Sequence, residues 1–196
     1  FDRLFQLMSG ISIIERMNAG ESAAEFERTE IAQPALFALQ AGLLASMQAK
    51  GLQADYVLGH SVGEVAAAYA SGAYDLAQAT HLIYERSQAQ ALTRGAGRMA
   101  AVGLSAEDTR EAIEALGLDI ELAAYNSTAS VTVSGQLTDL ETLGEALADR
   151  ECFYRILDLD YAFHSKVMDP VKDHLLESLA TRGLAPQSTT TAIIST

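Results

Sequence analysis

The sequence predicts an α/β fold, built as a core with a parallel sheet into which a small second lobe is inserted. Two observations predict the core: the short run DYVLGH shows no polar alternation, and a helical segment follows it after one tight turn. A third observation predicts the lobe, because the chain changes after RGAGR to short runs in the order β-α-β-β-α-β. We expect the core at residues 1–98 and 159–196, and the lobe at residues 99–158.

Composition limits the classes of protein. The 196 residues are 49% hydrophobic, which suffices for one sizeable core or one core with a small appended lobe. No apolar run reaches the about 18 residues of a membrane-spanning helix. The net charge of −13 argues against nucleic-acid binding, so an anionic ligand needs a local basic site. The single cysteine, Cys152, reads as a packing residue and favours a reducing, cytoplasmic location.

The core begins with helical segments. Apolar residues recur at helical spacing over residues 2–18, and residues 18–30 form a polar connector. Thr29 is expected to be the N-cap of a long helix that ends at Gly51, and its apolar residues on nearly all sides predict burial on several sides. The strand in DYVLGH does not alternate polar and apolar residues, so it is expected to be buried on both faces.

Two further helices complete this part of the core, from Ser61 to about Gly72 and from Asp75, as the cap, to the RGAGR segment. Within the lobe, Ser105 and Asp108 form a capping-box pattern for the first helix. The order of strands and helices there is the ferredoxin-like pattern. The core then resumes through DYAFHSKVMDP with a helix, VKDHLLESLATRG, and a last strand in TTTAIIST.

The segment Gly59-His60-Ser61-Val62-Gly63 places a serine on a sharp turn between a strand and a helix. Such a turn exposes the hydroxyl above the sheet edge, and small flanking residues avoid collisions across it. The helix that follows directs its free N–H groups toward the same point, and the Val62 N–H is placed to donate to an oxyanion. A capping serine in an ordinary turn is the alternative, but the strand–turn–helix context favours a nucleophile.

A serine nucleophile needs a base, and the chain has four histidines. His60 should point away from Ser61 and pack beneath the turn, while His81 and His174 fall within amphipathic helices. His164 follows a predicted strand directly, at the sheet edge where active groups gather. We therefore expect His164 to be the base, although a lone histidine is more often a hydrogen-bonded core residue.

Five segments together resemble the acyltransferase domains of polyketide and fatty acid synthases and the related malonyl-CoA:acyl carrier protein transacylases. They are QPALFALQAGLLASM, GHSVGEVAAAYASGAYDLAQATHLIYERS, GRMAAVGLS, AAYNSTASVTVSG and YAFHSKVMDPV. The resemblance implies an α/β hydrolase-like core with an inserted ferredoxin-like lobe. It also implies that the chain covers the middle of the domain, without the loop that carries an oxyanion-hole glutamine.

The resemblance assigns roles to individual residues. Ser61 corresponds to the acylated nucleophile and His164 to its base, which backbone carbonyls orient in this family. Arg86 corresponds to the arginine that binds the free carboxylate of a malonyl-type group, a task that suits a planar, permanently charged guanidinium. A surface arginine packing its stem on a helix is the alternative for Arg86. Gln33 and Asn126 correspond to substrate-pocket positions, and His60 is included with them.

Three positions bear on the acyl group. Phe163 resembles the bulky residue that accompanies malonyl selection, and Val62 also fits the malonyl pattern. Tyr161 departs from it, since tyrosine there accompanies methylmalonyl selection. One methyl group in a pocket is worth only ~1–3 kcal/mol, so the motif favours malonyl without deciding it.

The resemblance implies transfer from malonyl-CoA to the phosphopantetheine thiol of an acyl carrier protein, with neighbouring synthase domains as further partners. No permanently bound cofactor and no metal are expected, since ligand residues are not clustered. Weak candidates for a basic docking patch are Arg94, Arg98, Arg155 and Lys166. Two alternatives stay open: a serine hydrolase, for which Asp158 and Asp160 lie too close to His164 in the chain, and a non-catalytic docking domain.

Overall fold

The computed structural model describes residues 1–20 and 23–196, and these residues form two units. The first unit is Phe1–Ala91 with His174–Thr196, and the second is Leu92–Asp173. None of the helices in the described ranges combines the length and hydropathy that crossing a membrane requires. Residues 21 and 22 of the predicted polar connector lie outside the described residues.

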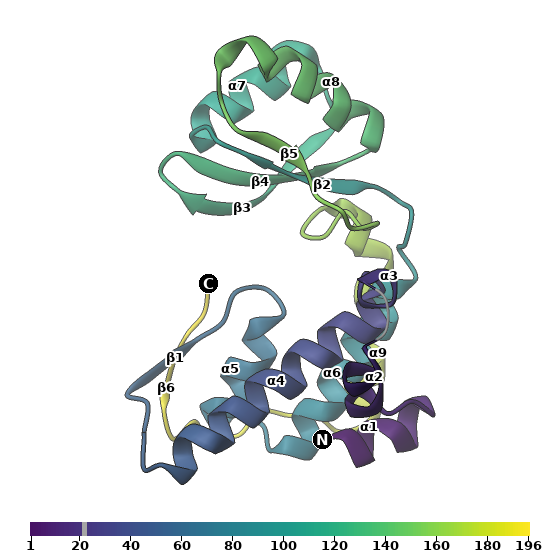
Figure 1. The fold of residues 1–196 in the computed structure, drawn as a ribbon, viewed down its shortest axis with the longest axis vertical. Coiled ribbons are helices and arrows are strands. Elements are labelled where there is room, and N and C mark those ends of the chain that lie inside the picture. Colours follow the sequence, from purple (N-terminus) through teal and green to yellow (C-terminus); the bar gives the residue numbers. More distant parts are fainter. Residues whose placement is uncertain (21–22) are drawn as a thin grey trace. The chain divides into compact units, whose positions relative to one another are not determined.

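The first unit is mainly helical, with a short pair of strands (Figure 1). Its elements are α1 (Asp2–Ser9), α2 (Ile13–Ala19), α3 (Ala23–Phe26), α4 (Thr29–Ala49), β1 (Tyr56–Leu58), α5 (Gly63–Ala70), α6 (Leu76–Ala91) and β6 (Ala192–Ile194). Helix α9 (Asp169–Thr181) leads the chain back into this unit. Strands β1 and β6 pair in parallel, which confirms the parallel arrangement predicted for the core.

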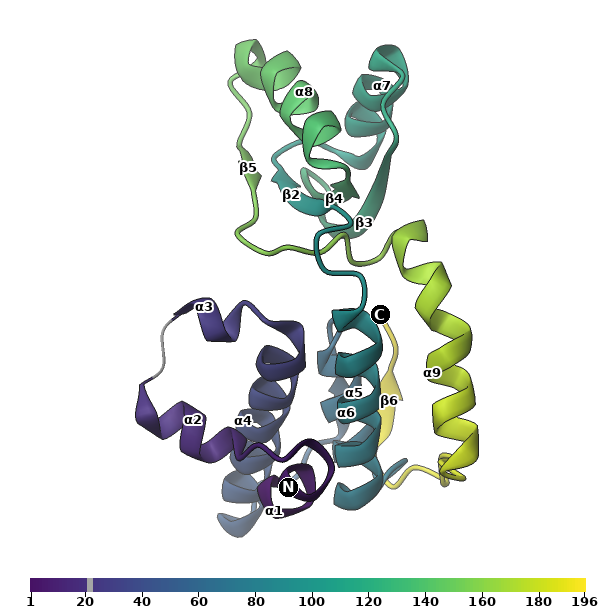
Figure 2. The same ribbon diagram turned by 90° about the vertical axis from the view of Figure 1, so that its right-hand side faces the viewer.

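Helices α4 and α6 lie side by side and carry the packing of the first unit (Figure 2). One cluster of buried side chains joins α4, α5 and α6, and a second joins α1, α2 and α4. The buried members of these clusters are Phe5, Ile13, Ile31, Ala35, Phe37, Ala41, Val65, Ala79 and Ile83. The two helices that hold Gln33 and Arg86 are thereby fixed against each other.

The helical spacing over residues 2–18 is confirmed, but one local expectation nearby is wrong. The spacing belongs to two helices, because Gly10 adopts the left-handed conformation, φ 74°, and ends α1. Ser12 then caps α2 by accepting a hydrogen bond from the Glu15 N–H at 3.0 Å. Thr29 is the first residue of α4 rather than its cap, a position that Arg28 takes.

Two burial expectations are also wrong. Strand β1 is not buried on both faces, since Tyr56 and Leu58 are 68% and 64% exposed. In the described residues β6 is the one strand that pairs with β1, so much of its surface is uncovered. Helix α4 buries one side only, and Leu39 and Leu43 on its other side are exposed.

The second unit has the predicted ferredoxin-like order of elements. They are β2 (Arg98–Val102), α7 (Ala106–Leu116), β3 (Ile120–Ser127), β4 (Ser130–Gly135), α8 (Leu137–Leu147) and β5 (Tyr154–Ile156), with 3-10 turns at Ala148–Arg150 and Lys166–Met168. The strands form an antiparallel sheet in the order β3-β4-β2-β5. Ser105 caps α7 by accepting from the Asp108 N–H at 3.1 Å, as its capping-box pattern predicts.

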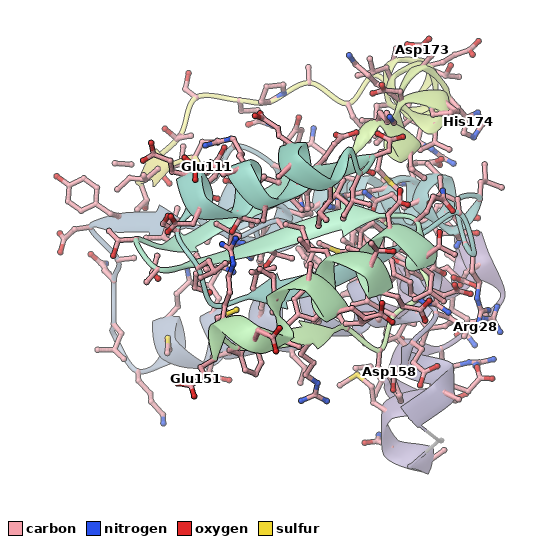
Figure 3. The ribbon with its side chains drawn as sticks, turned by 90° about the horizontal axis from the view of Figure 1, so that it is seen from above. Arg28, Glu111, Glu151, Asp158, Asp173 and His174 are labelled. Atoms are coloured by element: carbon pink, nitrogen blue, oxygen red, sulfur yellow. The ribbon has the colours of Figure 1, made fainter. Side chains whose placement is uncertain are left out.

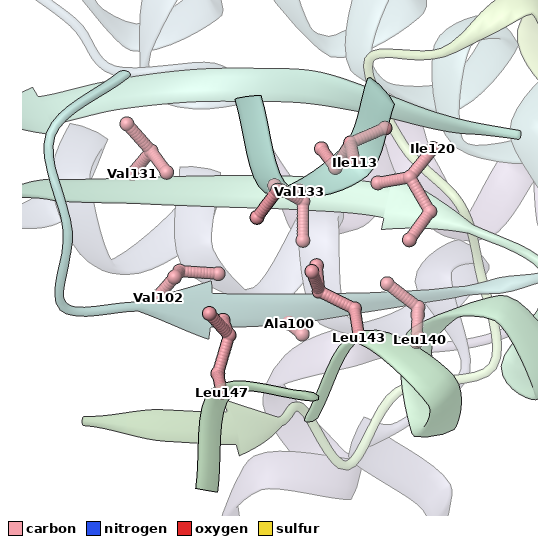
Figure 4. Close-up of a cluster of buried hydrophobic side chains, with 10 residues drawn as sticks. Ala100, Val102, Ile113, Ile120, Val131, Val133, Leu140, Leu143 and Leu147 are labelled. Atoms are coloured by element: carbon pink, nitrogen blue, oxygen red, sulfur yellow. The ribbon is translucent and has the colours of Figure 1, made fainter. Parts of the chain in front are cut away.

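The core of the second unit lies between the sheet and helices α7 and α8 (Figure 4). Val102, Val131 and Val133 of the strands and Leu140 and Leu143 of α8 belong to one cluster, and all five are fully buried. The alternation of β4, in which Val131 and Val133 face inward, is the period-2 pattern that predicts a half-buried strand.

Flanking segments also belong to the second unit. The Gly95 N–H donates to the Asp160 carbonyl at 2.9 Å, and the Leu157 N–H donates to the Met99 carbonyl at 2.8 Å. Arg98 forms an ion pair with Asp160. These contacts attach residues 92–98 and 159–173 to the sheet, and so fix the segment that carries His164 within this unit.

Candidate active site

Ser61 lies on a tight turn between β1 and α5 in the first unit. Its φ of 52° is in the left-handed region, which is strained for a residue with a side chain. A Cβ atom at Gly59 would lie 2.2 Å from the carbonyl carbon and oxygen of Gly63. The two backbone segments therefore approach so closely that only glycine fits at Gly59, as the serine-corner pattern predicts.

The turn leads directly into α5. The Gly63 N–H donates to the His60 carbonyl at 2.9 Å, and the Glu64 N–H donates to the Ser61 carbonyl at 3.0 Å. Val62 is the N-cap residue, so the N–H groups of the first turn gather beside the serine. The oxyanion role of the Val62 N–H stays a prediction.

Residues after β6 brace this turn. The Thr196 hydroxyl donates to the Gly59 carbonyl at 2.7 Å, and the Thr196 N–H donates to the Glu64 carboxylate at 2.8 Å. Glu64 thus links the first turn of α5 to the strand that pairs with β1. These contacts fix the end of β1, on which the position of the serine turn depends.

A cavity of about 480 Å³ adjoins the turn within the first unit. Gly59, His60 and Gly63 line it from the turn, and Gln40 and Leu44 line it from α4. His60 is exposed there, so the expectation that it packs beneath the turn is wrong. Its place in substrate binding stays a prediction.

Arg86 and Gln33 meet between α6 and α4. Gln33 is only 6% exposed, and its Oε1 accepts a hydrogen bond from Arg86 Nη1. Burial lowers the pKa of the Arg86 guanidinium, although an arginine stays charged in a protein. Within residues 1–20 and 23–196, no carboxylate forms an ion pair with Arg86. Arg86 is therefore a half-buried cation whose charge is not neutralised by a carboxylate of the described residues.

His164 lies in the second unit, in a loop fixed by several contacts. Tyr161 is buried and stacks on Phe163 with ring centroids 4.9 Å apart. The Ser134 hydroxyl donates to the Phe163 carbonyl at 2.6 Å. His164 itself is exposed and has a left-handed φ of 59°. A second strained residue at a functional position is consistent with a site, and its pairing with Ser61 stays a prediction.

The remaining predicted residues have ordinary surroundings. Asn126 is exposed on β3 and donates to the Thr132 hydroxyl at 2.9 Å. His174 is exposed on α9, as expected (Figure 3). His81 Nδ1 lies 3.4 Å from Arg182 Nη1. Burial, and to a lesser degree the Arg182 cation, lowers the pKa of His81.

The basic residues considered for a docking patch are mostly ion-paired inside the second unit. Arg94 and Arg98 both pair with Asp160, and Lys166 Nζ lies 2.5 Å from the Asp119 carboxylate. Arg155 is exposed on β5. Three of the four candidates are thus engaged with carboxylates, which weakens the case for a basic patch built from them.

Sequence reasoning missed two residues that contact Gln33. The Gln33 amide group donates to Gln90 Oε1 at 2.7 Å and to the Thr29 hydroxyl. Gln33 and Gln90 are 57 positions apart, so no local pattern connects them. The one available signal was the helical spacing that places Gln90 one turn after Arg86 on α6.

Known proteins are similar to this chain over nearly its whole length. A family model described as the acyl transferase domain matches residues 1–196. The polyketide synthase GfsA of Streptomyces halstedii is 38% identical over 189 residues, which are 95% of this chain and 2% of that protein. The mycoketide-CoA synthase of Mycobacterium tuberculosis is 32% identical over 185 residues, 94% of this chain and 4% of that protein.

Solved structures match the fold. The acyltransferase domain of the polyketide synthase PpsC of Mycobacterium tuberculosis superposes with a TM-score of 0.90 at 31% identity, covering 100% of this chain and 57% of that one. Malonyl CoA-acyl carrier protein transacylase from Burkholderia pseudomallei superposes with a TM-score of 0.87 at 26% identity, and the match covers 98% of this chain and 66% of that one. The chain thus spans a few per cent of the curated relatives and about 60% of these solved chains. It belongs to the acyl transferase domain family.

Proposed function

We propose that this chain transfers a malonyl-type acyl group from coenzyme A to the phosphopantetheine thiol of an acyl carrier protein, through an ester on Ser61. The Ser61 oxygen attacks the thioester carbonyl while His164 accepts its proton. The carbon–sulfur bond then breaks, and the coenzyme A sulfur leaves with the proton from His164. In the second half, His164 accepts the proton of the carrier thiol while its sulfur attacks the ester carbonyl. The carbon–oxygen bond to Ser61 then breaks, and His164 returns the proton to the serine oxygen.

The strained turn supports the choice of Ser61. A left-handed φ is costly for a serine, and strained residues of this kind cluster at functional sites. The N-terminal N–H groups of α5 suit an oxygen that becomes negative during attack. His164 is the proposed base by its resemblance to the family's histidine, and its left-handed φ of 59° fits this role; among the described non-glycine residues Ser61 and Glu151 also have a positive φ.

The observation that carries the substrate class is the state of Arg86. A half-buried guanidinium held by a neutral amide, with no ion pair in the described residues, can receive a carboxylate from a ligand. A malonyl-type acyl group carries such a carboxylate at its free end, whereas an acetyl group does not. Arg86 is therefore proposed to bind the free acid of the acyl group.

The test compares malonyl-CoA with acetyl-CoA as acyl donors to Arg86→Ala. Acylation of Ser61, followed by the mass of the intact protein, should fall by about 100-fold or more with malonyl-CoA, as for loss of a buried charge-assisted contact of ~3 kcal/mol. Acylation by acetyl-CoA should change little. An equal loss with both donors would refute the carboxylate role.

A second measurement separates transfer from hydrolysis. The acyl-enzyme is mixed with a phosphopantetheinylated carrier protein, and acyl-carrier and free malonate are quantified. Acyl-carrier should dominate. Rapid release of free malonate as the main product would instead indicate a serine hydrolase. The structure already weakens that alternative, because Asp160 is engaged with Arg94 and Arg98 and Asp158 is exposed (Figure 3).

Phe163 is proposed to favour malonyl over methylmalonyl groups. Its ring stacks on the buried Tyr161, which limits its freedom to move aside for an α-methyl branch. Competition between the two thioesters should yield mainly the malonyl enzyme, and Phe163→Ser should raise the methylmalonyl share by roughly 10-fold or more. An unchanged product ratio in Phe163→Ser would remove Phe163 from the specificity determinants.

A further inference from the structure

Both the nitrogen and the oxygen of the Gln33 side-chain amide form hydrogen bonds to other side chains. A glutamine amide has two N–H donors and one carbonyl oxygen. The nitrogen donates to Gln90 Oε1 at 2.7 Å and to the Thr29 hydroxyl, and the oxygen accepts from Arg86. Gln33 is 6% exposed and Thr29 is 3% exposed, so water does not replace these partners easily.

This arrangement fixes the direction of the amide. If the amide were turned over, its N–H groups would face the guanidinium, which has donors only, and its carbonyl oxygen would face the Gln90 oxygen. The contact with the guanidinium would be repulsive. The carbonyl oxygen of Gln33 therefore faces Arg86, and Gln90 and Thr29 hold the amide in this position by accepting hydrogen bonds from its nitrogen.

The partners of Arg86 in this network are uncharged. A carboxylate could also orient a guanidinium, but it would neutralise the charge that an acid ligand needs. Glutamine and threonine side chains orient the cation and leave that charge in place. Gln90 lies four residues after Arg86 on α6, so one helix carries both the cation and the acceptor that holds its orienting amide.

We propose that Gln90 is a positioning residue that acts through Gln33 to aim Arg86, and that it thereby sets the preference for acyl groups with a free carboxylate. This inference rests on the carboxylate role proposed for Arg86. Gln90 need not touch the substrate. Its loss affects a donor with an acid tail and spares one without it.

The test uses Gln90→Met in the full-length protein, because methionine keeps the unbranched shape and removes the acceptor. The KM and kcat for acylation of Ser61 are measured with malonyl-CoA and with acetyl-CoA in the same preparation. For malonyl-CoA we expect kcat/KM to fall by about 10-fold, the effect of one net hydrogen bond, mainly through KM. For acetyl-CoA we expect a change within about 2-fold. The acetyl-CoA reaction also reports that the variant is folded.

Gln88→Met is the matched control, since Gln88 is half-buried on the same helix and makes no hydrogen bond to Gln33 or Arg86 in the described structure. It should leave the malonyl-to-acetyl ratio unchanged. Arg86→Ala is measured alongside. A ratio unchanged in Gln90→Met, or a parallel loss with both donors, overturns the positioning role of Gln90. If Arg86→Ala also keeps the ratio, the proposed function of Arg86 fails as well, so the two failures are distinguishable.

Discussion

Alanine at Gly59 tests whether the close approach across the serine turn is essential. The added Cβ would lie 2.2 Å from the carbonyl carbon and oxygen of Gly63 and 2.4 Å from the Glu64 nitrogen. All three atoms are backbone, so no side chain can rotate away. Carbon atoms are best separated by about 3.5–4.0 Å, so the strand end and α5 must part by roughly 1 Å or more.

The size of the effect follows from this shift. Overpacking of this kind costs ~1–3 kcal/mol of folding free energy, and a displacement of about 1 Å at a nucleophile lowers the rate by about 100-fold. We therefore expect Gly59→Ala to lower the thermal unfolding midpoint and to reduce acylation of Ser61 by malonyl-CoA far more than stability alone explains.

Gly42→Ala provides the matched control. Gly42 lies inside α4, and a Cβ there would meet nothing within 4 Å. The same substitution should stabilise the protein by ~0.5–1 kcal/mol, because alanine favours the helix, and should leave acylation intact. If Ser61 of the Gly59→Ala variant is acylated at the wild-type rate, the close approach across the turn is not essential and the reasoning is refuted.

Three further predictions concern stability. Tyr154→Phe removes the hydroxyl that donates to the Leu140 carbonyl at 2.5 Å, and denaturant unfolding should show a loss of ~1 kcal/mol. In the folded protein, burial and the Arg182 cation lower the pKa of His81. Neutral His81 therefore contributes to folding stability above the ordinary histidine pKa, and this stability is lost as the pH falls through the lowered pKa of the folded state. His81→Gln should flatten the fall in melting temperature on acidification from pH 8, and an identical fall would contradict this. Arg182→Ala removes the ion-pair partner of Glu85, whose side chain is only 11% exposed. We expect a loss of ~1–2 kcal/mol in the free energy of unfolding, an amount already reduced for the solvent exposure of Arg182. An unchanged melting temperature would show that this ion pair does not stabilise the fold.

Local patterns predicted the second unit well. Strand β4 shows the period-2 pattern at Val131 and Val133, and Ser105 is a recognisable cap of α7. The order of elements in this unit is a recurrent supersecondary pattern, so it could be predicted although β2 pairs with the distant strands β4 and β5. The predicted order of strands and helices is therefore confirmed, including the antiparallel sheet.

Patterns predicted less well where burial depends on distant partners. The apolar strand β1 looked fully buried, but Tyr56 is exposed because the neighbours of a strand are not encoded in its own residues. Gly10 breaks the first helical stretch through its left-handed conformation, which apolar spacing does not reveal.

The site was predicted in part for the same reason. The serine turn is local, and its glycines and strand–helix context identify it. The contact between Gln33 and Arg86 joins residues 53 positions apart, and each role was suggested only by resemblance to a family. The hydrogen bonds from Thr29 and Gln90 to Gln33 could be found only in three dimensions.

The most direct test of the account is to trap the acyl-enzyme with malonyl-CoA and locate the modified residue by peptide mass spectrometry. We predict a single malonyl ester on Ser61, its absence in Ser61→Ala, and slow formation in His164→Ala. A malonyl group on another residue, or a labelled Ser61→Ala protein, would contradict the assignment of the nucleophile and with it the proposed reaction.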